Sequence, residues 1–228
     1  MMLFSRRMIL PLLFGLCGAA ILVDRGVWQL QRLQWKSGVL AEIDARISSA
    51  PVDLPVQPDV TTDKYLPVVA TGTLTGDEAH VLTSQRDLGP GYRVLAALRT
   101  DTGRQVLVDL GFVAEAGLAT PRPTGPVTVT GNLHWPDEVD SFTPPHDPRQ
   151  NIWFARDVPT IAAALQTEPF LLVARTTDPA IAGIDPLPVG SAGIANDHLE
   201  YAITWFSLAF VWLGMTGLLL WRIRQRAV

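Results

Sequence analysis

The stretch "AITWFSLAFVWLGMTGLLLW", residues 202–221, decides the fold because it holds twenty consecutive residues without a charge. About 20 apolar residues is the length a helix needs to cross the hydrocarbon of a bilayer. Trp205 and Trp221 lie near its two ends, where aromatic residues of the membrane interface are common. The stretch therefore predicts a transmembrane helix over 202–221, followed by a short tail over 222–228 that contains Arg222, Arg224 and Arg226.

A second apolar segment, Met8 to Val23, lies near the N-terminus and also carries no charge. With the long side chain of Arg25 reaching the interface, it predicts a transmembrane helix over 8–25. The alternatives are a cleaved signal peptide, a lipid anchor on Cys17, and twin-arginine export through "SRRMIL". The lipid anchor is disfavoured because Leu16, rather than a small residue, precedes the cysteine. The helical pattern continues past Val23, which favours an uncleaved helix.

Charge is distributed unevenly along the chain. Five of the 18 Lys and Arg residues lie in the two termini, so residues 24–201 hold 13 of them together with all 22 Asp and Glu, a net charge of 13 − 22 = −9. By the positive-inside rule both termini, 1–7 and 222–228, are expected in the cytoplasm, with a domain over 26–201 on the far side. In this helical hairpin Gly15, Ala19 and Gly214 are expected to allow close approach of the two helices, unless they are simply small residues of the kind common in membrane spans.

Residues 26–49 predict a helix that leaves the membrane, because apolar residues recur near helical spacing until Pro51 ends the pattern. Arg25, Arg32 and Lys36 lie at its start, close to the headgroups. They contact either lipid phosphates and nearby carboxylates, or an anionic ligand.

Residues 65–176 consist of short β-rich runs separated by turn residues. Six or so strands at regular spacing predict an α+β domain whose β part is an antiparallel barrel or sandwich, with a short helix in "VPTIAAALQ". In "RQVLVDLGFV" the residues Val106, Val108, Leu110 and Phe112 are expected on one face. Residues 177–195 are rich in Pro and Gly and predict a loop.

The composition excludes several functions. One cysteine allows neither an internal disulfide nor a cysteine-built zinc or copper site. A pI near 5.5 without a basic stripe argues against nucleic acid. Serine-hydrolase, zinc-protease, P-loop and dinucleotide-binding motifs are missing. The loop over 134–147 gathers histidines and carboxylates that could hold a hard cation, although such acidic loops are usually just solvated.

His198 stands in "NDHLEYA" at the start of the second span. Asp197 with Glu200 three residues later matches a capping box with Asp in place of Ser or Thr, so His198 is expected in the first turn. The helix dipole and the apolar phase favour its neutral form, the form that ligates iron or copper, while the two carboxylates oppose this. Spacing alone leaves both a capping or interfacial role and a ligand role open.

Four sequence elements, taken in order, resemble the Surf1 (Shy1) family of cytochrome c oxidase assembly factors. The first is Gly-x-Trp-Gln followed by Arg and Trp-Lys, and the second is a Gly-Tyr strand with a later "VLV-x-x-G" strand. The third is "N-x-W-F-x-R-D", and the fourth is Asn-x-His-Leu-x-Tyr-Ala-x-Thr-Trp. They fall at Gly26, Trp28, Gln29, Arg32, Trp35 and Lys36; at Gly91, Tyr92 and 106–111; at Asn151, Trp153, Phe154, Arg156 and Asp157; and at 196–205.

The chain departs from the family pattern at two places. Asp109 and Leu110 replace the usual Asn-Arg, and Phe112 replaces a Trp. Asp197 and Glu200 replace common amides, while His198 is retained.

The resemblance implies a non-enzymatic protein of the bacterial inner membrane with a periplasmic domain. It implies transient binding of haem a, with His198 as axial iron ligand, and assistance in inserting it into oxidase subunit I; haem a synthase and membrane lipids are further partners. Haem a is very apolar and has two propionates, so aromatic residues and cations near His198 are the candidate site: Tyr201, Trp205, Trp28, Arg25, Arg32 and Lys36. A cofactor-free scaffold for a subunit I intermediate is the alternative; copper delivery and hydrolysis are weaker alternatives.

Overall fold

The structure is a computed structural model that describes residues 6–86 and 88–226, so most of the predicted terminus 1–7 lies outside the described residues. The chain divides into two compact units. One holds the long helices and spans residues up to Glu42 and from Ala192 onward, and the other is Ile43–Ser191. Each unit is described by itself.

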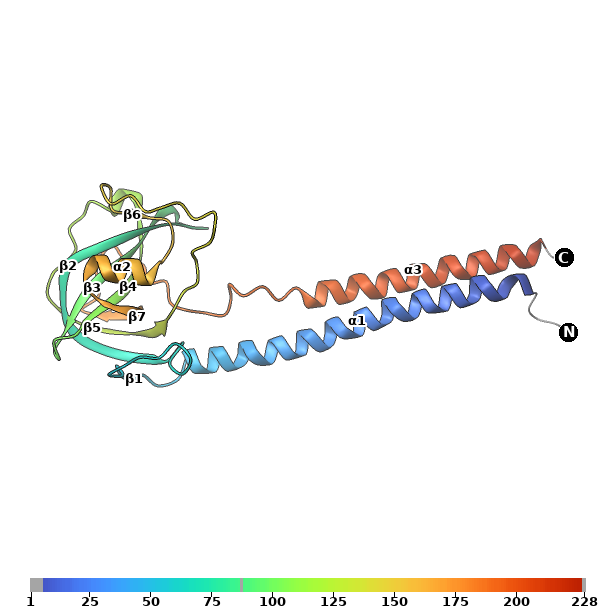
Figure 1. Cartoon of the computed structure of the whole chain (residues 1–228), viewed down its shortest axis with the longest axis horizontal. Helices are drawn as coiled ribbons and strands as arrows, with labels where there is room; N and C mark the ends of the chain where they lie inside the picture. Colours follow the sequence, from blue (N-terminus) through green and yellow to red (C-terminus); the bar gives the residue numbers. More distant parts are fainter. Residues whose placement is uncertain (1–5, 87, 227–228) are drawn as a thin grey trace. The chain divides into compact units, whose positions relative to one another are not determined.

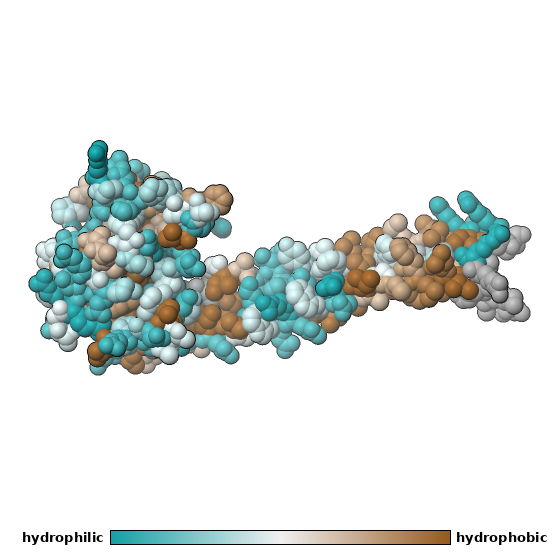
Figure 2. All heavy atoms as spheres, viewed as in Figure 1, coloured by the Kyte–Doolittle hydropathy of each residue, from teal (hydrophilic) through white to brown (hydrophobic). Residues whose placement is uncertain are grey.

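Two helices make up the first unit: most of α1 (Arg6–Ile47) and all of α3 (His198–Gln225). Both are long and apolar enough to cross a membrane, which fits a membrane protein. They run side by side in Figure 1. In Figure 2 hydrophobic residues cover the pair over the length nearest the chain ends, and hydrophilic residues gather further along. Because α1 runs without a break from Arg6 to Ile47, the helix predicted over 26–49 is continuous with the first apolar helix rather than a separate element.

Glycines on α1 allow the two helices to approach closely. A Cβ on Gly15 would run into Thr216, and one on Gly18 would lie 2.5 Å from the indole ring of Trp212. The indole Nε1 of Trp212 also donates a hydrogen bond of 2.9 Å to the carbonyl oxygen of Gly15. The expectation for Gly214 is wrong, because a Cβ there would meet nothing within 4 Å. Small residues alone did not reveal which face of α3 meets α1.

The second unit is built on a seven-stranded mixed sheet in the order β1-β2-β3-β4-β7-β5, with β6 and β5 also paired to β2. Its chain order is β1 (Val52–Asp53), β2 (Pro67–Gln85), β3 (Gly89–Thr100), β4 (Gln105–Ala114), the 3-10 helix η1 (Glu115–Gly117), β5 (Pro126–His134), β6 (Ile152–Trp153), α2 (Val158–Leu165) and β7 (Glu168–Asp178). The predicted α+β class and short helix are confirmed.

The expectation of a clean antiparallel barrel or sandwich is not met. Strand pairs β1–β2, β2–β6 and β4–β7 are parallel. Strand β2 runs unbroken from Pro67 to Gln85, although its register with β3 shifts between Leu74 and Glu78. Gly76, with φ of +91°, lies in that irregularity, so the "TGD" sequence bends one strand instead of ending it.

Strand β4 is buried on both faces, which explains its nearly continuous apolar sequence. Val106, Val108 and Leu110 join one core cluster, while Leu107 joins a second cluster with residues of α2. The alternation then breaks, because Leu110 is an extra residue between the pairs Leu95–Asp109 and Val94–Gly111. Val113 rather than Phe112 therefore continues the first cluster, which corrects the predicted face of Phe112.

The segment after β7 is fastened to the sheet although it contains no regular element. The backbone of Phe112 pairs with that of Asp185 through hydrogen bonds of 2.7 and 2.9 Å. Arg93 adds a hydrogen bond of 2.7 Å to the carbonyl oxygen of Leu187. These bonds hold the Pro/Gly-rich segment against β3 and β4.

Candidate functional site

His198 is the first residue of α3, as the sequence predicts, with Asp197 at the N-cap position. The predicted capping box is wrong, because the Asp197 side chain makes no capping hydrogen bond. The backbone carbonyl of Asp197 instead accepts from Tyr201 N–H at 3.2 Å. Glu200 in the first turn still suits the positive end of the helix dipole. The helix start therefore positions His198 without using its imidazole.

Among the residues that the structure describes, the side chain that hydrogen-bonds to the His198 imidazole comes from α1. The Nδ1 atom lies 2.7 Å from Oε1 of Gln29. An amide oxygen only accepts, so Nδ1 must carry the proton and donate it. In the neutral ring Nε2 then holds the lone pair. Gln29 thus fixes the tautomer that leaves Nε2 able to ligate a metal, which is the usual task of a second residue behind a ligating histidine.

Aromatic side chains lie near this histidine on α1 and further along α3. The ring of Trp28 stands edge-on to His198, with ring centroids 6.5 Å apart, and the indole is half exposed. Tyr201 and Trp205 follow His198 at helical spacings of three and seven residues, which places them along the same side of α3. Tyr201 is 57% exposed. The structure therefore brings Trp28 to His198 directly, and Tyr201 and Trp205 continue the aromatic surface along α3.

The predicted cations share a face of α1 with Gln29. Arg25, Gln29, Arg32 and Lys36 follow one another at spacings of four, three and four residues, about 6 Å of rise or less at each step. Lys36 donates to the carbonyl oxygen of Ala195. The guanidinium of Arg32 stacks on Trp35 at 3.9 Å from the ring centroid, and Arg25 is exposed.

Each cation therefore has a different use in this structure. Lys36 holds the segment that precedes α3 against α1. Arg25 and Arg32 remain the cations placed one turn on either side of Gln29, where they can meet an anion. Sequence reasoning missed Gln29 as a site residue, although it stands in the Gly-x-Trp-Gln element.

A single axial ligand with cations and aromatic rings nearby fits a haem. The fit rests on Nε2 of His198, whose lone pair is left available by the bond to Gln29. Haem iron accepts an imidazole nitrogen, and propionates accept hydrogen bonds from arginine. Within residues 6–86 and 88–226, no three His, Cys, Asp or Glu side chains gather where a metal ion could bind, and this includes the acidic loop over 134–147.

A second polar cluster lies in the sheet unit around Asp109, the residue that departs from the family pattern. Asp109 is fully buried on β4, with Oδ2 3.0 Å from Arg93 Nε and 3.5 Å from Arg156 Nη1. Burial raises the pKa of Asp109, and both arginines oppose that rise. Arg156 also pairs with Glu138 of the long loop. The cluster ties β3, β4 and that loop together.

The other polar residues of the "N-x-W-F-x-R-D" element have structural partners as well. Asn151 donates from Nδ2 to the Glu78 carbonyl at 2.8 Å, and its Oδ1 accepts from Trp153 Nε1 at 3.3 Å. Asp157 caps α2 by accepting from Thr160 N–H. This element therefore builds the fold of the sheet unit.

His134, at the end of β5, is a half-buried histidine next to this cluster. Burial lowers its pKa to about 4, and the charges of Arg156 and Lys64 add to that effect. Its ring stacks on Tyr65, with centroids 5.5 Å apart. His134 is neutral at physiological pH and packs against Tyr65 within the sheet unit.

Comparisons with known proteins agree with the four sequence elements. The SURF1 family model matches residues 16–210. A SURF1-like protein of Monosiga brevicollis is 32% identical over 213 residues, covering 83% of this chain and 80% of that protein. A SURF1-like protein of Rickettsia bellii (strain RML369-C) is 30% identical, covering 91% and 88%. Human Surfeit locus protein 1 is 26% identical, covering 81% and 69%. The chain therefore belongs to the SURF1 family.

Proposed function

We propose that this protein binds haem a at the membrane surface and assists its insertion into subunit I of cytochrome c oxidase, without catalysing a reaction. The observation that carries the proposal is the 2.7 Å bond from His198 Nδ1–H to Gln29, which leaves Nε2 as a ligand. Membership of the SURF1 family supports the link to oxidase assembly.

The residues around His198 account for binding and orientation. Trp28, Tyr201 and Trp205 offer apolar ring surface, and Arg25 and Arg32 offer donors for two propionates. Haem a is the cargo, and its iron takes the imidazole nitrogen as an axial ligand. One protein ligand suits a donor, because a second would hold the iron more tightly and slow its transfer.

The charge distribution supports an orientation for this site. Arginines at both chain ends favour cytoplasmic termini in the bacterial inner membrane. His198 would then lie at the periplasmic surface, where Trp205 marks the start of the second span. Subunit I and haem a synthase are membrane partners able to reach such a site.

The test is an absorption spectrum of the full chain purified after co-expression with haem a synthesis. We expect haem to copurify with the wild type and to be lost, or to show a shifted spectrum, in His198→Ala. His146→Ala is the matched control, because this exposed histidine stacks on Trp153 in the sheet unit. Haem retained by His198→Ala with an unchanged spectrum would remove His198 from the ligand role.

The alternative is a scaffold that holds a subunit I intermediate without a cofactor. It predicts that subunit I copurifies with the wild type and with His198→Ala alike, without stoichiometric haem in either preparation.

A further inference from the structure

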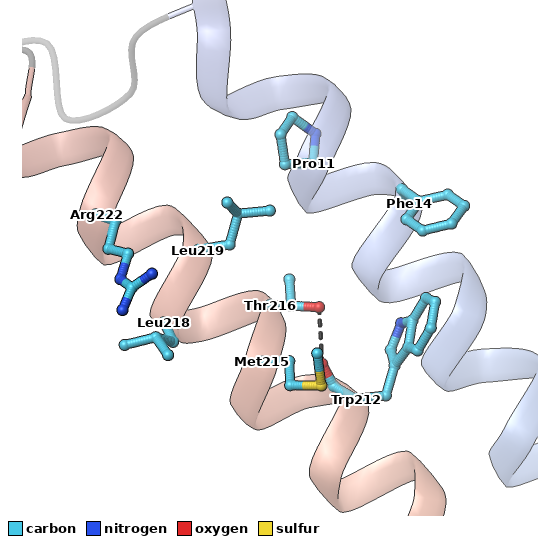
Figure 3. A pocket seen from close by; sticks show the side chains of 8 residues that line it. All are labelled: Pro11, Phe14, Trp212, Met215, Thr216, Leu218, Leu219 and Arg222. Carbon is cyan, nitrogen blue, oxygen red and sulfur yellow. Dashed lines mark hydrogen bonds between the residues drawn. The ribbon is translucent and has the colours of Figure 1, made fainter.

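A groove between α1 and α3 lies far from His198, toward the other end of the helix pair. It encloses about 360 Å³, and its lining side chains come from both helices: Pro11, Phe14, Trp212, Met215, Thr216, Leu218, Leu219 and Arg222. Figure 3 shows Pro11 on the side of α1 that faces α3, while the ring of Phe14 stands further along α1, with its centroid 5.4 Å from that of Trp212. Seventeen residues of α3 separate Met215 from His198, a rise of about 26 Å, so the groove is distinct from the candidate haem site.

One charged residue stands at the end of this apolar groove. Arg222 follows Leu218 and Leu219 by about one turn. Within residues 6–86 and 88–226, no carboxylate forms an ion pair with Arg222. Arg226 lies four residues further, on the same side of α3 as Arg222. The face therefore runs from apolar side chains to two cations along one line.

We propose that this groove binds an anionic phospholipid, with an acyl chain along Leu219 and Phe14 and the phosphate at Arg222 and Arg226. An uncharged acyl chain suits the lining, and a phosphate suits a guanidinium that no carboxylate of the described residues neutralises. Along the groove, apolar side chains come first and the two arginines follow. This order matches a bilayer, in which the hydrocarbon ends at the headgroups. Basic sites between transmembrane helices on the cytoplasmic side are known to select anionic lipids.

The groove exists because the helix contact ends there. Gly15 and Gly18 bring α1 close to Thr216 and Trp212, and the indole of Trp212 is held by its bond to the Gly15 carbonyl. Beyond Gly15 the α1 side chains are larger, and Pro11 and Phe14 stand at the rim. The same contact that pairs the helices thus leaves room for one chain of a lipid.

The test measures lipid retained by the full chain. The protein is reconstituted in vesicles of equal phosphatidylglycerol and phosphatidylcholine, extracted in mild detergent and analysed by native mass spectrometry. We expect the wild type to retain phosphatidylglycerol preferentially. Arg222→Gln should lower that preference about fivefold, the effect of one cation near an anionic headgroup. Arg224→Gln is the matched control, since it removes the same charge from another face of α3 and should leave the preference unchanged.

A second pair of variants tests the groove itself. Leu219→Trp fills the groove and should reduce retention of both lipids, whereas Leu213→Trp places the same ring outside the lining and should not. Met215→Trp repeats the steric test from another lining position.

Three results would overturn the proposal. The first is no lipid retained by the wild type, and the second is an equal loss in Arg222→Gln and Arg224→Gln, which indicates attraction to bulk charge only. The third is normal retention in both groove-filling variants. Circular dichroism of each variant confirms that the helices are intact.

Discussion

Replacing Gln29 with leucine tests the central contact of the proposed haem site. Leucine has a similar size but no acceptor, so the His198 imidazole loses its 2.7 Å partner on α1. The ring can then carry its proton on Nε2, where it blocks ligation, and it can also turn. The variant changes no group that would touch haem.

The expected magnitude follows from this one bond. A hydrogen bond between neutral groups contributes about 0.5–1.5 kcal/mol. Loss of the partner behind a metal-ligating histidine typically lowers affinity about 10–100-fold. Because Gln29 is a neutral acceptor and His198 is only half-buried, we expect the low end, about tenfold weaker haem binding, or ~1.4 kcal/mol.

The assay is a haem titration of the apo-protein followed by absorption, with two comparison variants. Gln31→Leu is the control, because this exposed glutamine lies on another face of α1. Gln29→Glu keeps an acceptor and should bind haem at least as well as the wild type. Nitrogen NMR of His198 in the apo-protein should show the Nδ1 proton in the wild type and its loss in Gln29→Leu. Wild-type affinity in Gln29→Leu, or equal weakening in Gln29→Glu, would refute the reasoning.

Three further predictions concern stability of the full chain in detergent. Asp109→Asn leaves Arg93 and Arg156 without a carboxylate on β4 and should lower the free energy of unfolding by about 3 kcal/mol. Hydrogen exchange in β3 and β4 should then be roughly 100-fold faster. Asp101→Asn, on the surface, should leave the exchange unchanged. The pKa of His134 is about 4 when folded against 6.5 in the unfolded chain, so unfolded chains bind the proton first as pH falls. The free energy of unfolding should therefore drop between pH 6.5 and 4, with about 1–2 kcal/mol of the drop due to His134 after solvent screening, and His134→Gln should lack that part of the drop. Gly18→Leu forces a side chain into the Trp212 ring and should destabilise the helix pair by about 1–3 kcal/mol in a detergent-denaturation titration, whereas Gly214→Leu should be neutral.

Patterns local in the sequence predicted much of the fold. Hydropathy predicted both long apolar helices, and alternation predicted most strands, because each depends on residues a few positions apart. Parallel pairing of β4 with β7 left no such signal, since both strands simply read as apolar. The bend at Gly76 also resembled a turn, and only pairing with β3 shows that the strand continues.

The sequence named two residues of the candidate site, His198 and Trp28, and the structure places their rings 6.5 Å apart. The ligand role of His198 stays a prediction. Gln29 and the Ala195 carbonyl were missed, because their partners lie 169 and 159 positions away in the sequence. Contacts between two helices depend on which faces meet, and hydropathy does not specify those faces.

The glycine contacts between α1 and α3 have a consequence at the distant imidazole. If α1 slid by one helical turn, Arg25 or Leu33 would stand opposite His198 instead of Gln29, and neither side chain has an acceptor. Gly15 and Gly18 oppose such a slide, because it would bring a bulkier α1 residue into the place of each glycine against α3. If His198 binds haem as proposed, the alignment of α1 with α3 decides which imidazole nitrogen is free to ligate the iron, and a partner that shifted one helix would abolish that ligand.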